Sequence, residues 1–258
     1  EADEVLSIFA AGYSEWEPKW IYRNYNVNAD IWTAHNFGGQ LAGTGFEWNG
    51  SMGFKNYWNA WTGGNLSTSQ LSAGTLRGGP MMKIPGNLRI YGGFSSDFRK
   101  KLNFSTFANT SWGLEKNSRS FYTELDITYK PTNFLYLTFS PSFNPSRTEL
   151  QYVTRKSVGG KDKYFFASID RKTISASFRV NMNLSPDLTL QYWGQPFIAT
   201  GKYHDHKVIL DPMADNYRDR FWTFTPEQRT FDEQNNQYRF DLDLDGTNDY
   251  VIGNNDFK

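Results

Sequence analysis

The stretch 173-TISASFRVNMNLSPDLTLQYWGQ-195 alternates apolar and polar side chains, turns at Ser-Pro-Asp, and then alternates again. A repeat of two residues is typical of a β-strand whose two faces meet different environments. In residues 173–184 one face is aliphatic and aromatic, and the other carries hydroxyl and amide groups with one arginine. The stretch therefore predicts two antiparallel strands joined by a tight turn.

The composition excludes several classes of function. The chain has 258 residues, and its 27 Lys and Arg balance its 27 Asp and Glu. A zero net charge lacks the basic field that nucleic-acid binding uses, so we expect no nucleic-acid partner. The absence of cysteine excludes thiol catalysis, zinc–thiolate sites and disulfides. No apolar run reaches the length of about 18 residues that a transmembrane helix needs, but the strands of a membrane barrel need no such run.

Alternation and turn residues predict about ten strands, which makes the chain an all-β protein. We expect them near residues 4–13, 20–33, 40–54, 57–63, 87–95, 102–113, 119–129, 134–143, 173–184 and 188–199. Their connections alternate between tight turns and longer loops, and the longest loops are expected at 64–86, 144–172 and 200–258. Short turns at one end and long loops at the other are typical of an outer-membrane β-barrel with an up-and-down antiparallel topology.

The polar side of the expected strands supports the same interpretation. It carries small hydroxyl and amide groups with occasional charges, which suits a wet lumen better than the Lys- and Glu-rich exterior of a soluble barrel. A soluble antiparallel sandwich is the alternative, but strands of about ten residues suit a tilted membrane crossing better than the usual five or six. We therefore expect a location in the bacterial outer membrane, with its lipid as a partner.

Several stretches together resemble a bacterial family described as a domain of unknown function. They are 37-FGGQLAGTGFEWNGSMGFKNYW-58, 75-TLRGGPMM-82, 140-SPSFNPSRTELQYV-153, 184-LSPDLTLQYWGQPFIATGKY-203 and 241-DLDLDGTNDYVIGNNDF-257. The resemblance implies the outer-membrane β-barrel region of Gram-negative proteins, usually placed behind a module similar to family 9 carbohydrate-binding domains. No biochemical activity is established for that family.

Two departures from the family limit what the resemblance implies. The carbohydrate-binding module does not lie within these 258 residues, so its glycan function is not carried over to them. The chain also stops at Lys258, inside the expected extracellular loop 200–258. We therefore expect residues 1–258 to be a single, incomplete barrel domain that needs strands before Glu1, after Lys258, or both. The first sixteen residues lack the basic start of a signal peptide, so we expect the chain to begin after processing or within a longer protein.

The segment 241-DLDLDGTND-249 is the sharpest chemical motif. Aspartates in a D-x-D-x-D-G-x-x-D pattern supply the hard oxygen ligands that calcium prefers, and Gly246 permits the turn. A full EF-hand loop is excluded because Ile252 stands where its glutamate would be. Calcium binding and a solvated acidic turn both remain open, and the candidate ligands are Asp241, Asp243, Asp245 and Asp249.

Other candidate residues carry weaker signals. Arg77 in the loop segment Arg77-Gly78-Gly79-Pro80 can bind an acidic group or anchor a plug, but such a segment more often only fixes loop shape. His204 and His206 would share a face in an extended segment, although a surface pair is the simpler interpretation. The aromatic segment 217–224 can stack on sugars or support loop packing.

Three charges are expected to point into the lumen: Glu124, Asp126 and Arg179. They can form a constriction that selects solutes, or pair with one another and stabilise a packed lumen. The sequence has no nucleophile–base motif, so the leading hypothesis is a non-enzymatic barrel that handles a solute or joins an envelope assembly. The alternative is a carbohydrate-processing enzyme or a glycan-uptake porin, with glycans or other envelope proteins as partners.

Overall fold

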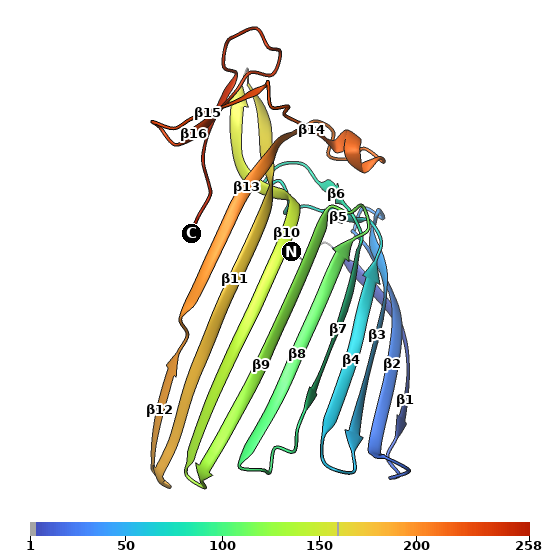
Figure 1. Ribbon diagram of the computed structural model, residues 1–258. Coiled ribbons are helices and arrows are strands. Elements are labelled where there is room, and N and C mark those ends of the chain that lie inside the picture. The colour runs from blue at the N-terminus through green and yellow to red at the C-terminus, as the bar shows by residue number, and fades with distance from the viewer. Residues whose placement is uncertain (1–3, 159) are drawn as a thin grey trace.

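The computed structural model describes residues 4–158 and 160–258. In that part of the chain, twelve strands form one curved antiparallel sheet, in the order β1-β2-β3-β4-β7-β8-β9-β10-β11-β13-β14 with β12 also paired to β11 (Figure 1). The predicted antiparallel all-β class is therefore confirmed. The strands are β1 (Val5–Glu15), β2 (Tyr22–His35), β3 (Leu41–Phe54), β4 (Asn59–Ser67), β7 (Asn87–Ser95), β8 (Leu102–Gly113), β9 (Ser118–Thr132), β10 (Leu135–Val158), β11 (Lys161–Ser185), β12 (Leu188–Gly194), β13 (Phe197–Ile209) and β14 (Phe221–Thr223).

Smaller elements lie at the upper end of the sheet. The β4–β7 loop contains a two-stranded ladder of β5 (Gln70–Ser72) and β6 (Met82–Ile84), and η1 (Tyr217–Arg220) is a 3-10 turn. The C-terminal region adds a three-stranded sheet of β15 (Arg229–Asp232), β16 (Gln237–Phe240) and β17 (Tyr250–Gly253). In the residues described, no helix has the length and apolarity needed to cross a lipid bilayer.

The register separates the large sheet into an apolar face and a polar face. Cross-strand partners on the apolar face include Phe104, Ile127, Phe139 and Phe178 in one row. The polar face carries mostly serine, threonine and asparagine at the intervening positions. The β4–β7 loop lies on the polar side of the sheet. Near its start Gln70 lies beside Gly43 of β3, and further along Leu76 packs with Tyr164 and Phe166 of β11. The loop therefore bridges the polar side from β3 to β11. The polar face is therefore the concave one, and the apolar face is convex.

The β10–β11 hairpin is longer than the sequence indicated. Residues 144–172 were expected to form a loop, and this expectation is wrong: β10 continues to Val158 and β11 begins at Lys161. The alternation disappears in residues 164–169 because both faces are buried there. Tyr164 and Phe166 pack into one hydrophobic cluster, whereas Phe165 between them packs into another on the opposite side. A strand covered on both faces has no polar side to reveal its period.

The two clusters define a cap above the sheet, made of the upper β10–β11 hairpin, the β4–β7 loop, η1 and the β15–β17 sheet. One cluster joins Tyr164 and Phe166 to residues of the β4–β7 loop, η1 and β14: Leu76, Met82, Tyr217 and Phe221. The other joins Phe165 and Val208 to the C-terminal region: Phe224, Phe240 and Ile252. These interdigitating side chains hold segments together that lie far apart in the sequence.

The C-terminal third also differs from the expected single strand and loop. The strand expected at 188–199 is interrupted at Pro196, and β12 and β13 pair with successive parts of β11. Residues 200–258 were expected to be a long loop, but β13 continues to Ile209 and four further strands, β14 to β17, follow. Phe257 then returns to the outer edge of β13, where it forms a bridge with Gly201. Proline explains the interruption, because it has no amide hydrogen for the ladder.

Candidate functional site

The centre of the polar face is a network of side-chain hydrogen bonds. The Asp126 carboxylate accepts hydrogen bonds from Ser105, at 3.2 Å, and from Ser140. Tyr122 donates a 2.6 Å hydrogen bond to Glu124 on the same strand. Both carboxylates, predicted to be lumen charges, therefore lie half-buried in the middle of the concave face, each fixed by hydroxyl groups.

Arg179 lies on the same face but apart from the two carboxylates. Its cross-strand partner on β10 is Thr138, whose partner on β9 is Thr128. Among the residues described, no ion pair joins Arg179 to Glu124 or Asp126. The structure therefore does not join the three charges in one paired network, and it leaves the Arg179 side chain exposed to the concave side.

Four aromatic side chains run across the polar face beside these carboxylates: Trp61, Tyr91, Phe107 and Tyr122. We call this set the aromatic strip. The ring centroids of Tyr91 and Phe107 are 6.4 Å apart, and those of Phe107 and Tyr122 are 6.1 Å apart. The Trp61 indole covers Gly93, where an added Cβ would lie 2.6 Å from the Trp61 Cζ2 atom. Sequence reasoning missed this strip because only the register of β4, β7, β8 and β9 brings the rings together.

The Arg77-Gly78-Gly79-Pro80 segment attaches the β4–β7 loop to the upper hairpin. The Arg77 guanidinium stacks over the Tyr152 ring at 4.4 Å from its centroid. A Cβ added at Gly79 would lie 2.6 Å from Tyr164 Cζ, so only glycine allows this close approach. Arg77 therefore binds an aromatic ring of the cap, and the two glycines and Pro80 shape the turn that places it there.

Polar contacts reinforce this attachment. Glu149 accepts hydrogen bonds from Tyr217, at 3.0 Å, and from Arg218 of the same η1 turn. Burial, followed by the nearby Glu149 carboxylate, raises the pKa of Tyr217 well above its ordinary value. The buried Arg220 donates to the carbonyl oxygens of Lys83, Ala214 and Asp215 at 2.8–3.0 Å. The segment 217–224 is therefore used largely in packing, as one of the two sequence interpretations proposed.

The two histidines do not form a joint metal site. Asp205 between them has a φ of +47°, which breaks the extended geometry that would place both rings on one face. His204 hydrogen-bonds to Asp205 at 2.7 Å and to Asp170 at 3.2 Å. His206 is instead buried against the rings of Tyr238 and Phe240, and this burial lowers its pKa to about 4.

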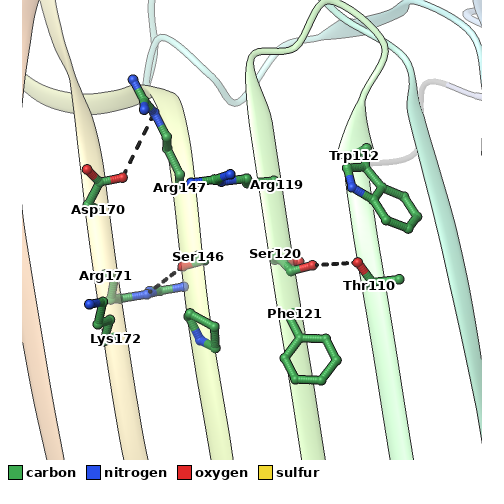
Figure 2. Close-up of a pocket in the computed structure, with 11 residues that line it drawn as sticks. Thr110, Trp112, Arg119, Ser120, Phe121, Ser146, Arg147, Asp170, Arg171 and Lys172 are labelled. Carbon is green, nitrogen blue, oxygen red and sulfur yellow. Dashed lines mark hydrogen bonds and ion pairs between the residues drawn. The ribbon is translucent and has the colours of Figure 1, made fainter.

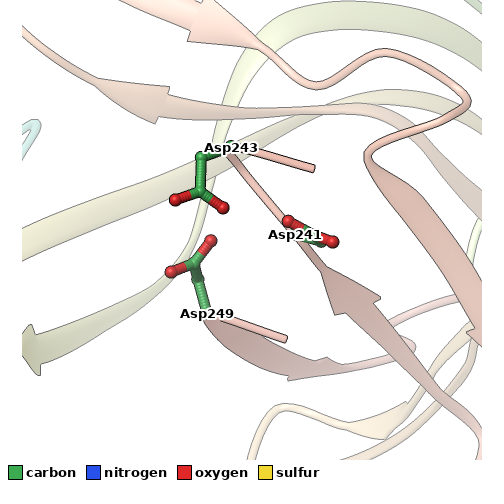
Figure 3. Close-up of side chains that lie close together, drawn as sticks. All are labelled: Asp241, Asp243 and Asp249. Carbon is green, nitrogen blue, oxygen red and sulfur yellow. The ribbon is translucent and has the colours of Figure 1, made fainter. Parts of the chain in front are cut away.

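The acidic motif forms the loop between β16 and β17. Asp241 follows β16 directly, Asp249 precedes β17, and the Asp249 amide donates to the Phe240 carbonyl at 2.8 Å. Carboxylate oxygens of Asp241, Asp243 and Asp249 all lie within 4.8 Å of one another (Figure 3). Asp245 is not in this group, and its carboxylate accepts a hydrogen bond from the Thr247 amide at 2.7 Å. The structure thus brings three of the four candidate calcium ligands together.

One oxygen of this group is especially suited to a cation. Asp241 Oδ1 is buried and has no hydrogen-bond partner among the residues described. Its other oxygen accepts a 2.9 Å hydrogen bond from the Gly246 amide. A buried, unpaired carboxylate oxygen is costly, and a hard cation would satisfy it. The donor set therefore fits calcium.

A hollow of about 550 Å³ lies on the opposite, apolar face at its upper rim, between β8 and β11 (Figure 2). Its lining combines apolar residues with cations, and Trp112, Phe121 and Pro145 lie beside Arg119, Arg147 and Lys172. Sequence reasoning missed this group because its cations come from three strands and each is unremarkable alone.

Comparison with known proteins identifies a family. The model of a family described as a domain of unknown function (DUF5916) matches residues 2–252. Neither the search of curated proteins nor that of solved structures gives a match.

Proposed function

The chain belongs to the DUF5916 family, a domain of unknown function, and we propose from its geometry that it forms the wall of an outer-membrane β-barrel. In this proposal the apolar face contacts lipid acyl chains and the polar face lines a wet interior. The protein is non-enzymatic and handles a solute at the concave face and the cap. Its location is the outer membrane of a Gram-negative bacterium.

The observation that carries this proposal is the uncovered apolar face. Large apolar side chains remain exposed along its height, for example Leu125, Phe143, Ile174, Phe178 and Tyr192. A soluble protein rarely exposes a continuous apolar surface of this extent. A sandwich would cover this face with a second layer, but in the residues described the layers that pack on the large sheet are confined to its upper end. Lipid is the environment that matches such a surface.

Strand length fits the same proposal. The twelve residues of β8 and fifteen of β9 exceed the 9–11 that a tilted strand needs to cross a bilayer. A closed wall also requires pairing partners along β1 and along the outer edge of β12 and β13, because an open sheet edge is not stable in hydrocarbon. The bridge between Gly201 and Phe257 supports such pairing on the β13 side.

The aromatic strip favours glycan uptake as the second candidate function. Aromatic rings stack on the apolar faces of sugars, and nearby hydroxyl, amide and carboxylate groups can bond to sugar hydroxyls. Tyr122 already combines both properties through its hydrogen bond to Glu124. The structure offers no comparable argument for the carbohydrate-processing enzyme.

Reconstitution tests the proposed function. The full chain, refolded in the presence of phosphatidylcholine vesicles, is expected to float with them and to resist alkaline extraction. Monodisperse behaviour in buffer without any amphiphile would contradict the proposal.

Vesicle swelling in linear oligosaccharides tests glycan passage. The double variant Trp61→Ala with Tyr122→Ala should slow swelling in oligosaccharides more than swelling in a small amino acid. Trp112→Ala on the apolar face is the control. Equal slowing by both variants would argue against a role of the aromatic strip in glycan passage.

We also propose that the β16–β17 loop binds calcium through Asp241, Asp243 and Asp249. The site has three carboxylates on a surface loop, so we expect a dissociation constant on the order of 0.1–1 mM, as in extracellular modules. Asp243→Asn should weaken binding about tenfold, a loss of roughly 1.4 kcal/mol. Isothermal titration with Ca²⁺ measures this. Asp245→Asn is the matched control and should change the affinity little; an equal loss in both variants would mean that the negative charge of the turn attracts Ca²⁺ without a defined ligand set, and no binding by the wild type would mean that the turn is merely solvated.

A further inference from the structure

Four cations form a band across the upper rim of the apolar face: Arg119, Arg147, Lys172 and Lys202. We call this band the basic rim. Arg119 and Arg147 are direct cross-strand partners on β9 and β10. Asp170 pairs with Arg147 on one side and with Lys202 on the other, while Lys172 lies opposite Pro145 in the next row. The register therefore assembles the basic rim from four strands.

This arrangement is unfavourable without a ligand. Like charges directly opposite each other in a sheet destabilise it, and Figure 2 shows the Arg119 side chain extending toward β10, where Arg147 lies. Asp170 is the one carboxylate among the described residues that line the hollow. Its oxygens lie 3.9 Å from Arg147 Nε and 3.2 Å from His204 Nε2. The positive charge of Arg119 and Lys172 therefore remains uncompensated.

The surface below the basic rim indicates what kind of anion fits. Trp112 and Phe121 line the hollow beside Arg119 and are both exposed. The next row toward the middle of the sheet contains Phe143 and Ile174, and the apolar face continues below them. A ligand that occupies both surfaces needs anionic groups at one end and hydrocarbon chains at the other. Arginine recognises phosphate through two parallel hydrogen bonds, whereas lysine acts as a point charge.

We propose that the basic rim binds the phosphorylated headgroup of an outer-leaflet glycolipid, whose acyl chains lie on the apolar face. This inference rests on the proposed function, because it requires the apolar face to be in the membrane. The rim is at the end of the sheet that carries the cap and the longer connections, which is the extracellular end of an outer-membrane barrel. Charge complementarity and the continuous apolar surface together select a phosphorylated lipid over a soluble anion.

The test uses the full chain in phosphatidylcholine nanodiscs, with native mass spectrometry to count retained lipid. Lipid A with two phosphates should be retained at least about tenfold more tightly than dephosphorylated lipid A, as expected when a charge-assisted hydrogen bond is lost. The variant with Arg119→Gln, Arg147→Gln and Lys172→Gln should lose this preference. Arg179→Gln removes one positive charge from the polar face of the same β11 strand and should retain it.

A second variant separates binding from folding defects. Asp170→Asn removes the carboxylate that competes with phosphate, so it should strengthen lipid A retention, an effect that structural damage would not produce. Equal retention of both forms of lipid A by the wild type would overturn the inference. The inference would also be overturned if inorganic phosphate bound the chain as tightly as lipid A does and left lipid A retention unchanged. Failure of the wild type to enter nanodiscs would instead overturn the proposed function itself.

Discussion

Leu125→Arg is expected to prevent stable insertion of the chain into lipid vesicles. Leu125 lies on the apolar face of β9, opposite Thr106 and midway along the apolar surface, and it is 39% exposed. A cation on the lipid side of a barrel at the bilayer midplane costs roughly 2–4 kcal/mol. Urea titration of the folded chain in vesicles, followed by electrophoretic mobility without boiling, measures this loss.

The matched control places the same charge at the same depth on the other face. Ser105 pairs with Asp126 on the polar face, so Ser105→Arg introduces a cation beside an existing carboxylate. We expect this variant to insert nearly as well as the wild type, because its charge faces the wet interior and gains a partner. If Leu125→Arg inserted as readily as Ser105→Arg, the assignment of the apolar face to lipid would be wrong.

Phe165→Ala is expected to release the β15–β17 sheet from the cap. Phe165 is fully buried, stacks with Phe224 at 6.4 Å and meets Tyr250 edge-on at 4.8 Å between ring centroids. Truncating such a phenylalanine costs about 3–5 kcal/mol, because it removes apolar contacts and leaves a cavity. Hydrogen–deuterium exchange should show that residues 229–253 lose protection while the lower strands keep theirs.

Phe231→Ala is the control for this prediction. Phe231 belongs to the same small sheet and contacts Tyr238 at 4.8 Å, but it is 41% exposed. We expect only a small change in exchange, since little buried area is lost. Equal protection of residues 229–253 in wild type and Phe165→Ala would show that the β15–β17 sheet is held by other contacts than this cluster.

The sequence alone predicted those strands whose two faces differ in polarity. In residues 173–184 the alternation separated Ile174 and Phe178 from Ser175 and Arg179, and the structure places these pairs on opposite faces of β11. This succeeded because the side-chain period of a strand is a local property of the backbone. The same reasoning failed at Tyr164, Phe165 and Phe166, where cap segments bury both faces.

The cap and the sites were decided by tertiary structure. The motif of residues 241–249 was visible in the sequence because a single loop supplies its three clustered aspartates. The aromatic strip, the serines around Asp126 and the basic rim were not, because each joins residues from three or more strands. Their positions depend on cross-strand register, and a shift of one residue would exchange the two faces. The sequence therefore determined which environment each side chain suits, and the pairing of distant strands determined which side chains meet.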